Sequence, residues 1–448
     1  MHFEHEAMRN LLLAALSVGA LTVSLLDARD AAACGGCFAP PDNPSVVTDH
    51  RMILSISKDQ TTLYDQIRYQ GDPKAFAWVL PIRGIVNVGL SSDVLFGSLD
   101  QMTQTVVNAP PLNCPALNCR NGGFVSAGAN DSADAGVVVI KHEVVGPYET
   151  VQLSATDPSA LKTWLATNDF NLPADVEPVV AQYVNEKFDF LALKLLPGKG
   201  VASMRPVRIT TPGAAAALPL RMVAAGTGAT VGISLWIVGE GRYEPQNFPT
   251  FRIQDSELVY DYTQSRSNYT ELRAAKTAAS QGRGWELESS LQLNAYTLKS
   301  YVENGGYAYG GGQTEQDYLP VDGPNPKTAS QVRDEDLETL FHGISQGDLR
   351  VTRLRADLAH SALDQDIAFS APADQSIATN IHTAAKANNA PACPTCGPGQ
   401  DADGNPGGYG VGSSGGTNVS TGEAGFGAIA MLGFVGFAFA RRRRQRAA

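Results

Sequence analysis

The fold is decided by the stretch Met52-Ile-Leu-Ser-Ile-Ser-Lys-Asp-Gln-Thr-Thr-Leu-Tyr-Asp-Gln-Ile-Arg-Tyr69. Apolar residues alternate with polar ones on both sides of the turn-forming triplet Lys58-Asp-Gln60. A third apolar run follows at residues 76–82, after another group of turn residues. Alternation that is broken by turn residues at short intervals predicts an antiparallel meander.

Downstream of this stretch, helix and strand patterns come in runs. Ser92 and Asp157 each fit the N-cap of a helix. Strand patterns recur at residues 188–195, 206–210, 218–224 and 233–238, and helical patterns at 269–280 and 334–341 precede a closing strand at 349–358. This clustering predicts an α+β fold, an antiparallel-sheet-rich body with several packed helices, and not a doubly wound sheet. Two strand-rich segments, 45–110 and 137–240, could form sub-layers of the body.

Toward the N-terminus, an apolar run at residues 11–26 leads to Ala31-Ala-Ala33 and then Cys34. An apolar segment followed by small residues is typical of a secretory signal peptide. We therefore expect residues 1–33 to be a signal peptide, cleaved between Ala33 and Cys34 by the export machinery. A transmembrane helix is the less favoured alternative, because a bilayer core requires about 20 apolar residues. Lipidation of Cys34 is a second alternative, since this cysteine directly follows the small residues.

The cysteines occur as close pairs, which are Cys34 with Cys37, Cys114 with Cys119, and Cys393 with Cys396. An even number of locally paired cysteines in an exported chain favours disulfide bonds. A redox-active CxxC pair is an alternative, but it normally lies at the start of a helix, and proline follows both CxxC motifs closely. A zinc site formed by the two CxxC motifs is another. We predict structural disulfides.

Several of these motifs, taken together, resemble an exported bacterial family, domain of unknown function 2330. The resemblance rests on Cys34-Gly-Gly-Cys-Phe38, Tyr69–Pro81, Val145–Glu149, Ala160–Leu165, Leu218–Arg221 and Val351–Arg355. It covers residues 34–369 and implies one folded unit, an extracytoplasmic domain over residues 34–370. It implies no activity and no catalytic residue.

The C-terminal region changes character after residue 370. Residues 371–424 are rich in Gly, Ala, Asn, Ser and Pro, which predicts a flexible Gly-rich stalk. An apolar segment, Gly425–Ala440, and the cluster Arg441, Arg442, Arg443 and Arg444 follow. This order predicts a single apolar helix that spans the membrane, with residues 441–448 as a basic cytoplasmic tail. The arrangement also resembles C-terminal sorting tails, including the myxobacterial kind, which implies a sorting protease as a partner.

No motif specifies a catalytic centre. Residues 343–347 match the GxSxG of hydrolases around Ser345, but a predicted helix precedes and a strand follows, in the reverse of the required order. Ser55 and Lys58 match SxxK within a hairpin that points them to opposite faces. Asp401-Ala-Asp403-Gly-Asn405 resembles a calcium loop without its distal glutamate. The mature chain has five histidines without metal-binding spacing, namely His50, His142, His342, His360 and His382. We expect no catalytic residue, no metal and no cofactor.

The charge balance restricts the partners. The formal net charge is -11, and phosphate backbones need a basic footprint, so we expect no nucleic-acid partner. The sequence therefore predicts an exported protein in the cell envelope or at the cell surface, attached by its C-terminal tail, with a binding or structural role and an unknown partner. Two alternatives stay open. One is an exported hydrolase whose site assembles only in the fold, and the other is an envelope redox or metal-handling protein that uses its CxxC pairs.

Overall fold

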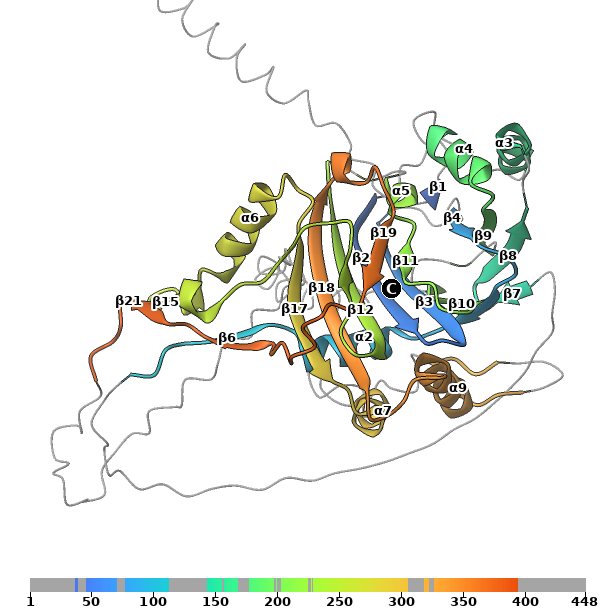
Figure 1. The fold of residues 1–448 in the computed structure, drawn as a ribbon. Coiled ribbons are helices and arrows are strands. Elements are labelled where there is room, and N and C mark those ends of the chain that lie inside the picture. Colours follow the sequence, from blue (N-terminus) through green and yellow to red (C-terminus); the bar gives the residue numbers. More distant parts are fainter. Residues whose placement is uncertain are drawn as a thin grey trace, which may run out of the picture.

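The fold is built on two β-sheets packed face to face, with helices outside them (Figure 1). This α+β architecture confirms the predicted fold class. The computed structural model describes residues 37–38, 46–70, 77–112, 143–154, 157–167, 177–196, 199, 203–224, 227, 229–304, 318–321 and 326–393.

The larger sheet has eight strands within these residues. Their order is β14 (Thr250–Phe251), β17 (Trp285–Gln292), β18 (Leu349–Ala359), β12 (Thr230–Glu240), β2 (Val46–Ile56), β3 (Gln60–Gln70), β10 (Val207–Pro212) and β5 (Asn87–Leu90). Strands β2 and β3 form the predicted antiparallel hairpin, whereas β2 pairs with β12 in parallel. The sheet is therefore mixed.

The smaller sheet has five described strands, in the order β1 (Cys37–Phe38), β4 (Ala77–Ile82), β9 (Asp189–Leu195), β8 (Tyr148–Leu153) and β7 (Glu143–Val145). Strand β4 was predicted to extend the first hairpin as a meander, and this is wrong. Strand β10 occupies the free edge of β3, and β4 instead pairs with β1 and β9. Residues 45–110 and 137–240 each contribute strands to both sheets, so they interleave and are not separate sub-layers.

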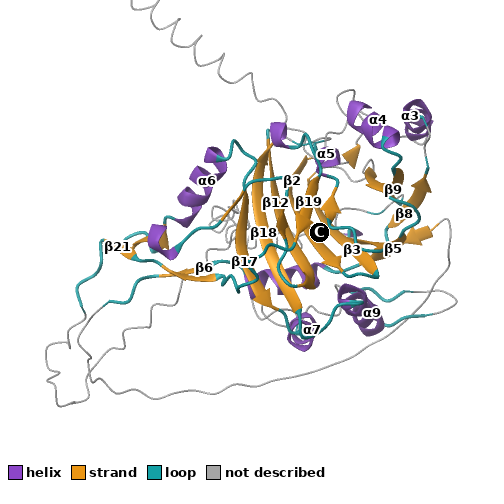
Figure 2. Cartoon of the chain, in the orientation of Figure 1, coloured by secondary structure: helices purple, strands orange, loops and turns teal. Residues whose placement is uncertain are grey.

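Three of the hydrophobic clusters separate four layers, namely helices, the larger sheet, the smaller sheet and further helices (Figure 2). The first lies between the sheets, where Met52 and Leu54 of β2 belong to the same cluster as Trp78 and Leu80 of β4. The second covers the other face of the larger sheet with α2 (Asp93–Thr103), α7 (Ala295–Glu303) and α9 (Ala329–Phe341). The third packs α3 (Pro158–Thr167) and α4 (Glu177–Asn185) on the outer face of the smaller sheet. The period-two pattern of β2 thus serves two cores, one on each face.

Local signals position most of the helices. The Ser92 hydroxyl accepts a hydrogen bond from the Val94 amide and begins α2, as predicted. Helix α9 begins with a capping box between Thr328 and Gln331. The predicted strand at residues 218–224 is wrong, because the chain forms only β11 (Ala217–Leu218) before the short helix α5 (Leu220–Val223).

The described strands continue past residue 370, the expected end of the body. The remaining elements are β6 (Val106–Asn108), β13 (Glu244–Pro245), η3 (Asp255–Glu257), β15 (Val259–Asp261), β16 (Arg266–Ser267), α6 (Tyr269–Ala279), η5 (His360–Ala362), β19 (Ile367–Ser370), β20 (Ile381–Thr383) and β21 (Lys386–Asn388). Strand β20 pairs with β6 and β21 with β15, next to a small apolar cluster that includes Ala384.

Candidate functional site

Buried charged groups fix the outer helices to the sheets, and the first cluster surrounds Asp336 of α9. Its Oδ2 accepts hydrogen bonds from the hydroxyls of Ser91 at 2.6 Å and Tyr318 at 3.0 Å, and its Oδ1 accepts one from Arg208 at 2.9 Å. Burial raises the pKa of the Asp336 carboxyl, and the Arg208 guanidinium acts in the opposite direction. A Cβ on Gly89 would lie 2.8 Å from the Nη2 of Arg208, so only glycine leaves this guanidinium its room. Because both carboxylate oxygens are hydrogen-bonded, this cluster is structural.

A second cluster fixes α2 to the larger sheet through Arg353 of β18. The buried Arg353 guanidinium donates to the buried carboxylate of Glu288 and forms an ion pair of 2.7 Å with Asp100 of α2. It also lies over the ring of Trp236, at 5.1 Å from the centroid, and Arg51 lies 5.2 Å from the same ring. A buried indole with a guanidinium at this distance on each of two sides is a cation–π arrangement.

Beside this cluster, Glu286 of β17 is buried, and only one of its two carboxyl oxygens is hydrogen-bonded to a described residue. Its Oε1 accepts a hydrogen bond of 2.6 Å from the Tyr269 hydroxyl, whereas its Oε2 has no hydrogen-bond partner among the residues that the structure describes. Burial, and then the charge of Glu288, raise the pKa of Glu286 to about 8, against smaller opposing effects of Tyr269, Arg273 and Arg355. The Glu286 carboxyl is therefore largely protonated at neutral pH.

A third cluster joins α4, α5 and the loop before β19. Arg221 donates to both oxygens of Glu186 and to Oδ2 of Asp366, each at 2.7 Å. The Tyr183 hydroxyl donates to the other oxygen of Asp366, and the Arg221 guanidinium lies 4.2 Å from the Tyr183 ring centroid. Arg221 is thus bidentate and stacked, which is a structural use of arginine.

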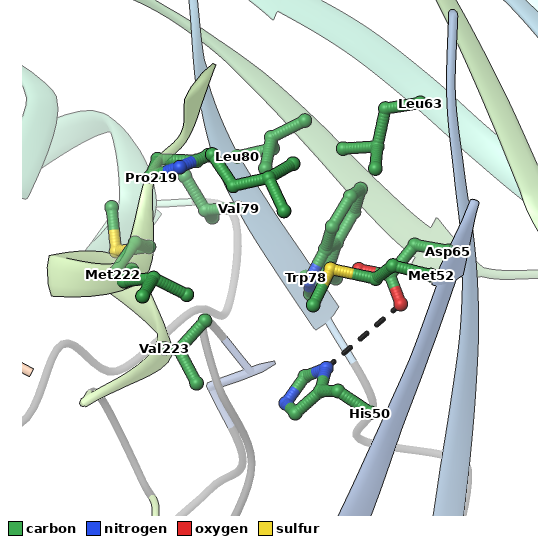
Figure 3. A pocket seen from close by; sticks show the side chains of 12 residues that line it. His50, Met52, Leu63, Asp65, Trp78, Val79, Leu80, Pro219, Met222 and Val223 are labelled. Carbon is green, nitrogen blue, oxygen red and sulfur yellow. Dashed lines mark ion pairs between the residues drawn. The ribbon is translucent and has the colours of Figure 1, made fainter. Parts of the chain in front are cut away.

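A pair without such partners, His50 and Asp65, lines a small cavity between the two sheets (Figure 3). The register of the hairpin places Met52 of β2 opposite Asp65 of β3, and His50 lies two residues before Met52 on the same face. The pairing of β2 with β3 shifts by one residue just before His50. Such bulges re-aim side chains and are frequent next to functional sites. Trp78 of β4 and the segment from β11 to α5 complete the wall.

The geometry of this pair distinguishes it from the three clusters. The Nδ1 of His50 lies 3.8 Å from the Oδ1 of Asp65, which is an ion-pair distance if the imidazole is protonated but is too long for a hydrogen bond. Within the described part of the chain, neither ring nitrogen of His50 nor Oδ1 of Asp65 has a hydrogen-bond partner. His50 is 1% exposed and Asp65 is 4% exposed. A buried polar group without a partner costs about 1–3 kcal/mol, so this pair is the strongest candidate for a functional site.

The chemistry of the cavity favours binding. Its volume is about 20 Å³ for water-sized groups, and roughly 10–15 Å³ is enough for one water molecule. Apart from His50 and Asp65, the described residues that line it are Leu, Val, Met, Trp and Pro. None of these lining residues is a Ser, Thr, Cys, Lys or Tyr that could act as a nucleophile.

In the sequence, His50 is one of the scattered histidines, and Asp65 belongs to no motif. Their alternation with the apolar residues could have indicated burial. Both occupy positions of the hairpin that face the core, where the other side chains are apolar, namely Met52, Leu54 and Leu63. Their meeting with Trp78 depends on the packing of a second sheet, which the pattern did not specify.

The other motifs do not come together at this cavity. Ser345 is exposed behind the end of α9, and Gly343 has a positive φ of 70°, so the GxSxG segment is a helix end and turn. Ser55 donates to the Leu340 carbonyl oxygen. His342 and His360 are exposed, whereas His382 contacts Asp255 at 2.7 Å. His142 and the segment 401–405 lie outside the described residues.

The structure describes only two of the six cysteines, Cys37 and Cys393. The backbone of Cys37 pairs with that of Trp78, and Cys393 is disulfide-bonded. Cys34, Cys114, Cys119 and Cys396 lie outside the described residues, so the three disulfide pairings stay predictions. The signal peptide, the apolar segment 425–440 and the arginine cluster also lie outside them. Residues 371–393 of the predicted stalk are described, and they form β20 and β21 instead of a flexible segment. Over the residues that the structure does describe, no helix is long and apolar enough to span a membrane, and no three His, Cys, Asp or Glu side chains gather as metal ligands.

Comparison with known proteins gives one match. No curated protein and no solved structure matches the chain. Residues 28–307, more than half of the chain, match the family described as an uncharacterised protein conserved in bacteria, domain of unknown function 2330 (DUF2330). The chain therefore belongs to the DUF2330 family of bacterial proteins.

Proposed function

We propose that this chain is an exported bacterial protein, attached to the cell envelope by its C-terminal tail, that binds a small ligand in the cavity of His50 and Asp65. The observation that carries the binding function is the cavity itself. It joins two buried polar side chains in an otherwise apolar wall, and their facing atoms have no hydrogen-bond partner among the described residues. Buried polar groups are normally hydrogen-bonded, and a ligand in this cavity would supply the missing partner.

Export and attachment are supported by the order of segments along the chain. The signal-peptide pattern ends at Cys34, the cysteines are locally paired, and Cys393 is disulfide-bonded. Disulfides persist in oxidising compartments. The apolar segment 425–440 with Arg441–Arg444 at its end supports an anchor, retained as a span or recognised by a sorting protease.

The hydrolase alternative requires a nucleophile or an activated water beside an acid–base group. His50 and Asp65 could orient a water, but the described lining offers no Ser, Thr, Cys, Lys or Tyr nucleophile and no further polar group to stabilise a developing charge. The redox alternative requires a CxxC pair that cycles between its dithiol and disulfide forms. The disulfide at Cys393 is compatible with it but equally with a structural role.

Location is tested by expressing the full chain and treating spheroplasts with protease. We expect protease to degrade the body while a cytoplasmic marker stays intact, and the body to fractionate with membranes. A matched chain that ends at residue 424 should appear in the soluble extracytoplasmic fraction. Protection of the full chain in spheroplasts, with degradation only after lysis, would contradict export. Release of the full chain and the truncated chain to the same extent would contradict attachment.

A further inference from the structure

We infer that the cavity of His50 and Asp65 is a binding site for a soft monovalent metal cation, Cu(I) or its analogue Ag(I). This inference rests on the proposed binding function and names the class of ligand. The argument uses the distance between the two polar groups, the donor atoms around them and the charge that they carry.

The distance fits a metal ion better than a water molecule. A single water that makes two hydrogen bonds of about 2.8 Å at a tetrahedral angle would separate its partners by roughly 4.6 Å. The observed separation of Nδ1 and Oδ1 is 3.8 Å. An ion at about 2.1 Å from each atom would subtend an angle of roughly 130° between them. This angle lies between trigonal and linear, which is the geometry of an ion with few ligands.

The surrounding donors are soft. Met52 lies two residues from His50 on the same face of β2, and its thioether lies beside the ring of Trp78, in the cavity that His50 and Asp65 also line (Figure 3). Thioether sulfur and imidazole nitrogen together favour Cu(I) over hard cations. The Trp78 side chain is 2% exposed and lines the same cavity, and an aromatic ring attracts a nearby cation. Met52, His50 and Asp65 thus line the site from the larger sheet, and Trp78 lines it from the smaller sheet.

The charge of the site also selects a monovalent ion. Asp65 is the only acidic side chain among the described residues that line the cavity. One carboxylate balances one positive charge, whereas a divalent ion would leave a net charge in an apolar interior. Zinc sites commonly use four ligands and calcium sites six or more oxygens. The described lining offers neither set.

The test is an anaerobic titration of the mature chain with Cu(I) against a chromophoric Cu(I) chelator, after any free thiols have been alkylated. We expect one Cu(I) per chain. The variants Met52→Leu and His50→Gln should weaken binding by more than ~100-fold, beyond the ~10–100-fold that loss of an outer-shell partner causes. Met52→Leu nearly conserves volume and should leave the fold intact. Melting curves check that each variant is folded.

Two matched variants serve as controls. Met204→Leu changes a methionine that packs against the same core but does not line the cavity, and His360→Gln changes an exposed histidine. Both should bind Cu(I) as the wild type does. Equal binding by the wild type, Met52→Leu and His50→Gln would place the metal elsewhere and overturn the inference.

A second readout separates this inference from the proposed function. Protein purified from its native envelope is examined for total metal and for bound small molecules by mass spectrometry, together with His50→Gln. Copper present in the wild type and lost in the variant supports the inference. A different ligand with the same dependence on His50 overturns the inference but leaves the binding function standing. The absence of any ligand that depends on His50 overturns both.

Discussion

Replacing Arg353 by methionine is expected to lower the free energy of unfolding by about 3–5 kcal/mol, because it leaves the buried Glu288 without its cation. The Arg353 guanidinium is 2% exposed and connects Glu288 of β17 with Asp100 of α2. Methionine fills much of the volume of Arg353 beside Trp236. The loss in the free energy of unfolding therefore measures the missing charge more than the missing packing. Urea unfolding of both proteins under the same conditions measures the difference.

The matched control for this prediction is Arg266→Met. Arg266 pairs with Glu271 at the surface, where both side chains are about half exposed, and such pairs contribute about 0–1 kcal/mol. Adding Glu288→Gln to Arg353→Met should recover part of the loss, since the uncompensated charge is then removed. A loss in Arg353→Met no greater than that in Arg266→Met would show that the ion pairs of Arg353 with Glu288 and Asp100 do not stabilise the fold.

Raising the pH from 5 to 8 is expected to destabilise the protein through Glu286. The pKa of this carboxyl is about 8 in the folded chain, and about 4.3 in an unfolded chain. Between these values unfolding releases a proton, so the stabilisation is complete below the unfolded pKa and is lost as the pH rises through the folded one. The expected slope is up to about 1.4 kcal/mol per pH unit.

The variant Glu286→Gln isolates this effect, because its amide does not titrate and can still accept from the Tyr269 hydroxyl. Its free energy of unfolding should exceed that of the wild type increasingly from pH 5 to pH 8, and the difference should reach several kcal/mol. Glu338→Gln changes an exposed glutamate and should leave the pH slope as it is. Identical slopes in the wild type and Glu286→Gln would contradict protonation of the buried carboxyl.

The local features of the fold could be predicted from the sequence. The hairpin of β2 and β3 follows from alternation around one turn, and the start of α2 follows from Ser92. Such signals depend on residues close in the chain. The pairing partners of a strand depend on residues far apart in the chain. Alternation specifies which face of a strand is buried, but it does not specify which strand pairs with it. For this reason β4 was assigned to the wrong sheet and the parallel pairing of β2 with β12 was not predicted.

The candidate site was missed for a related physical reason. His50 and Asp65 become unusual only because the smaller sheet covers them with Trp78 and excludes water. The charged residues of the three clusters are equally ordinary in the sequence. Their burial, and the partners that compensate it, arise from segments far apart in the chain, such as Arg353 with Asp100.

We propose that His50 and Asp65 serve a ligand and not the stability of the fold. The most direct test is the free energy of unfolding of the apo double variant His50→Leu/Asp65→Leu, measured by urea denaturation beside the wild type without ligand. Replacing an uncompensated buried pair by apolar residues of similar size is often neutral or stabilises a protein by about 1–4 kcal/mol. We therefore predict a free energy of unfolding equal to or above that of the wild type. A loss of about 2 kcal/mol or more, the range of a broken structural contact, would show that the pair supports the fold and would contradict the claim.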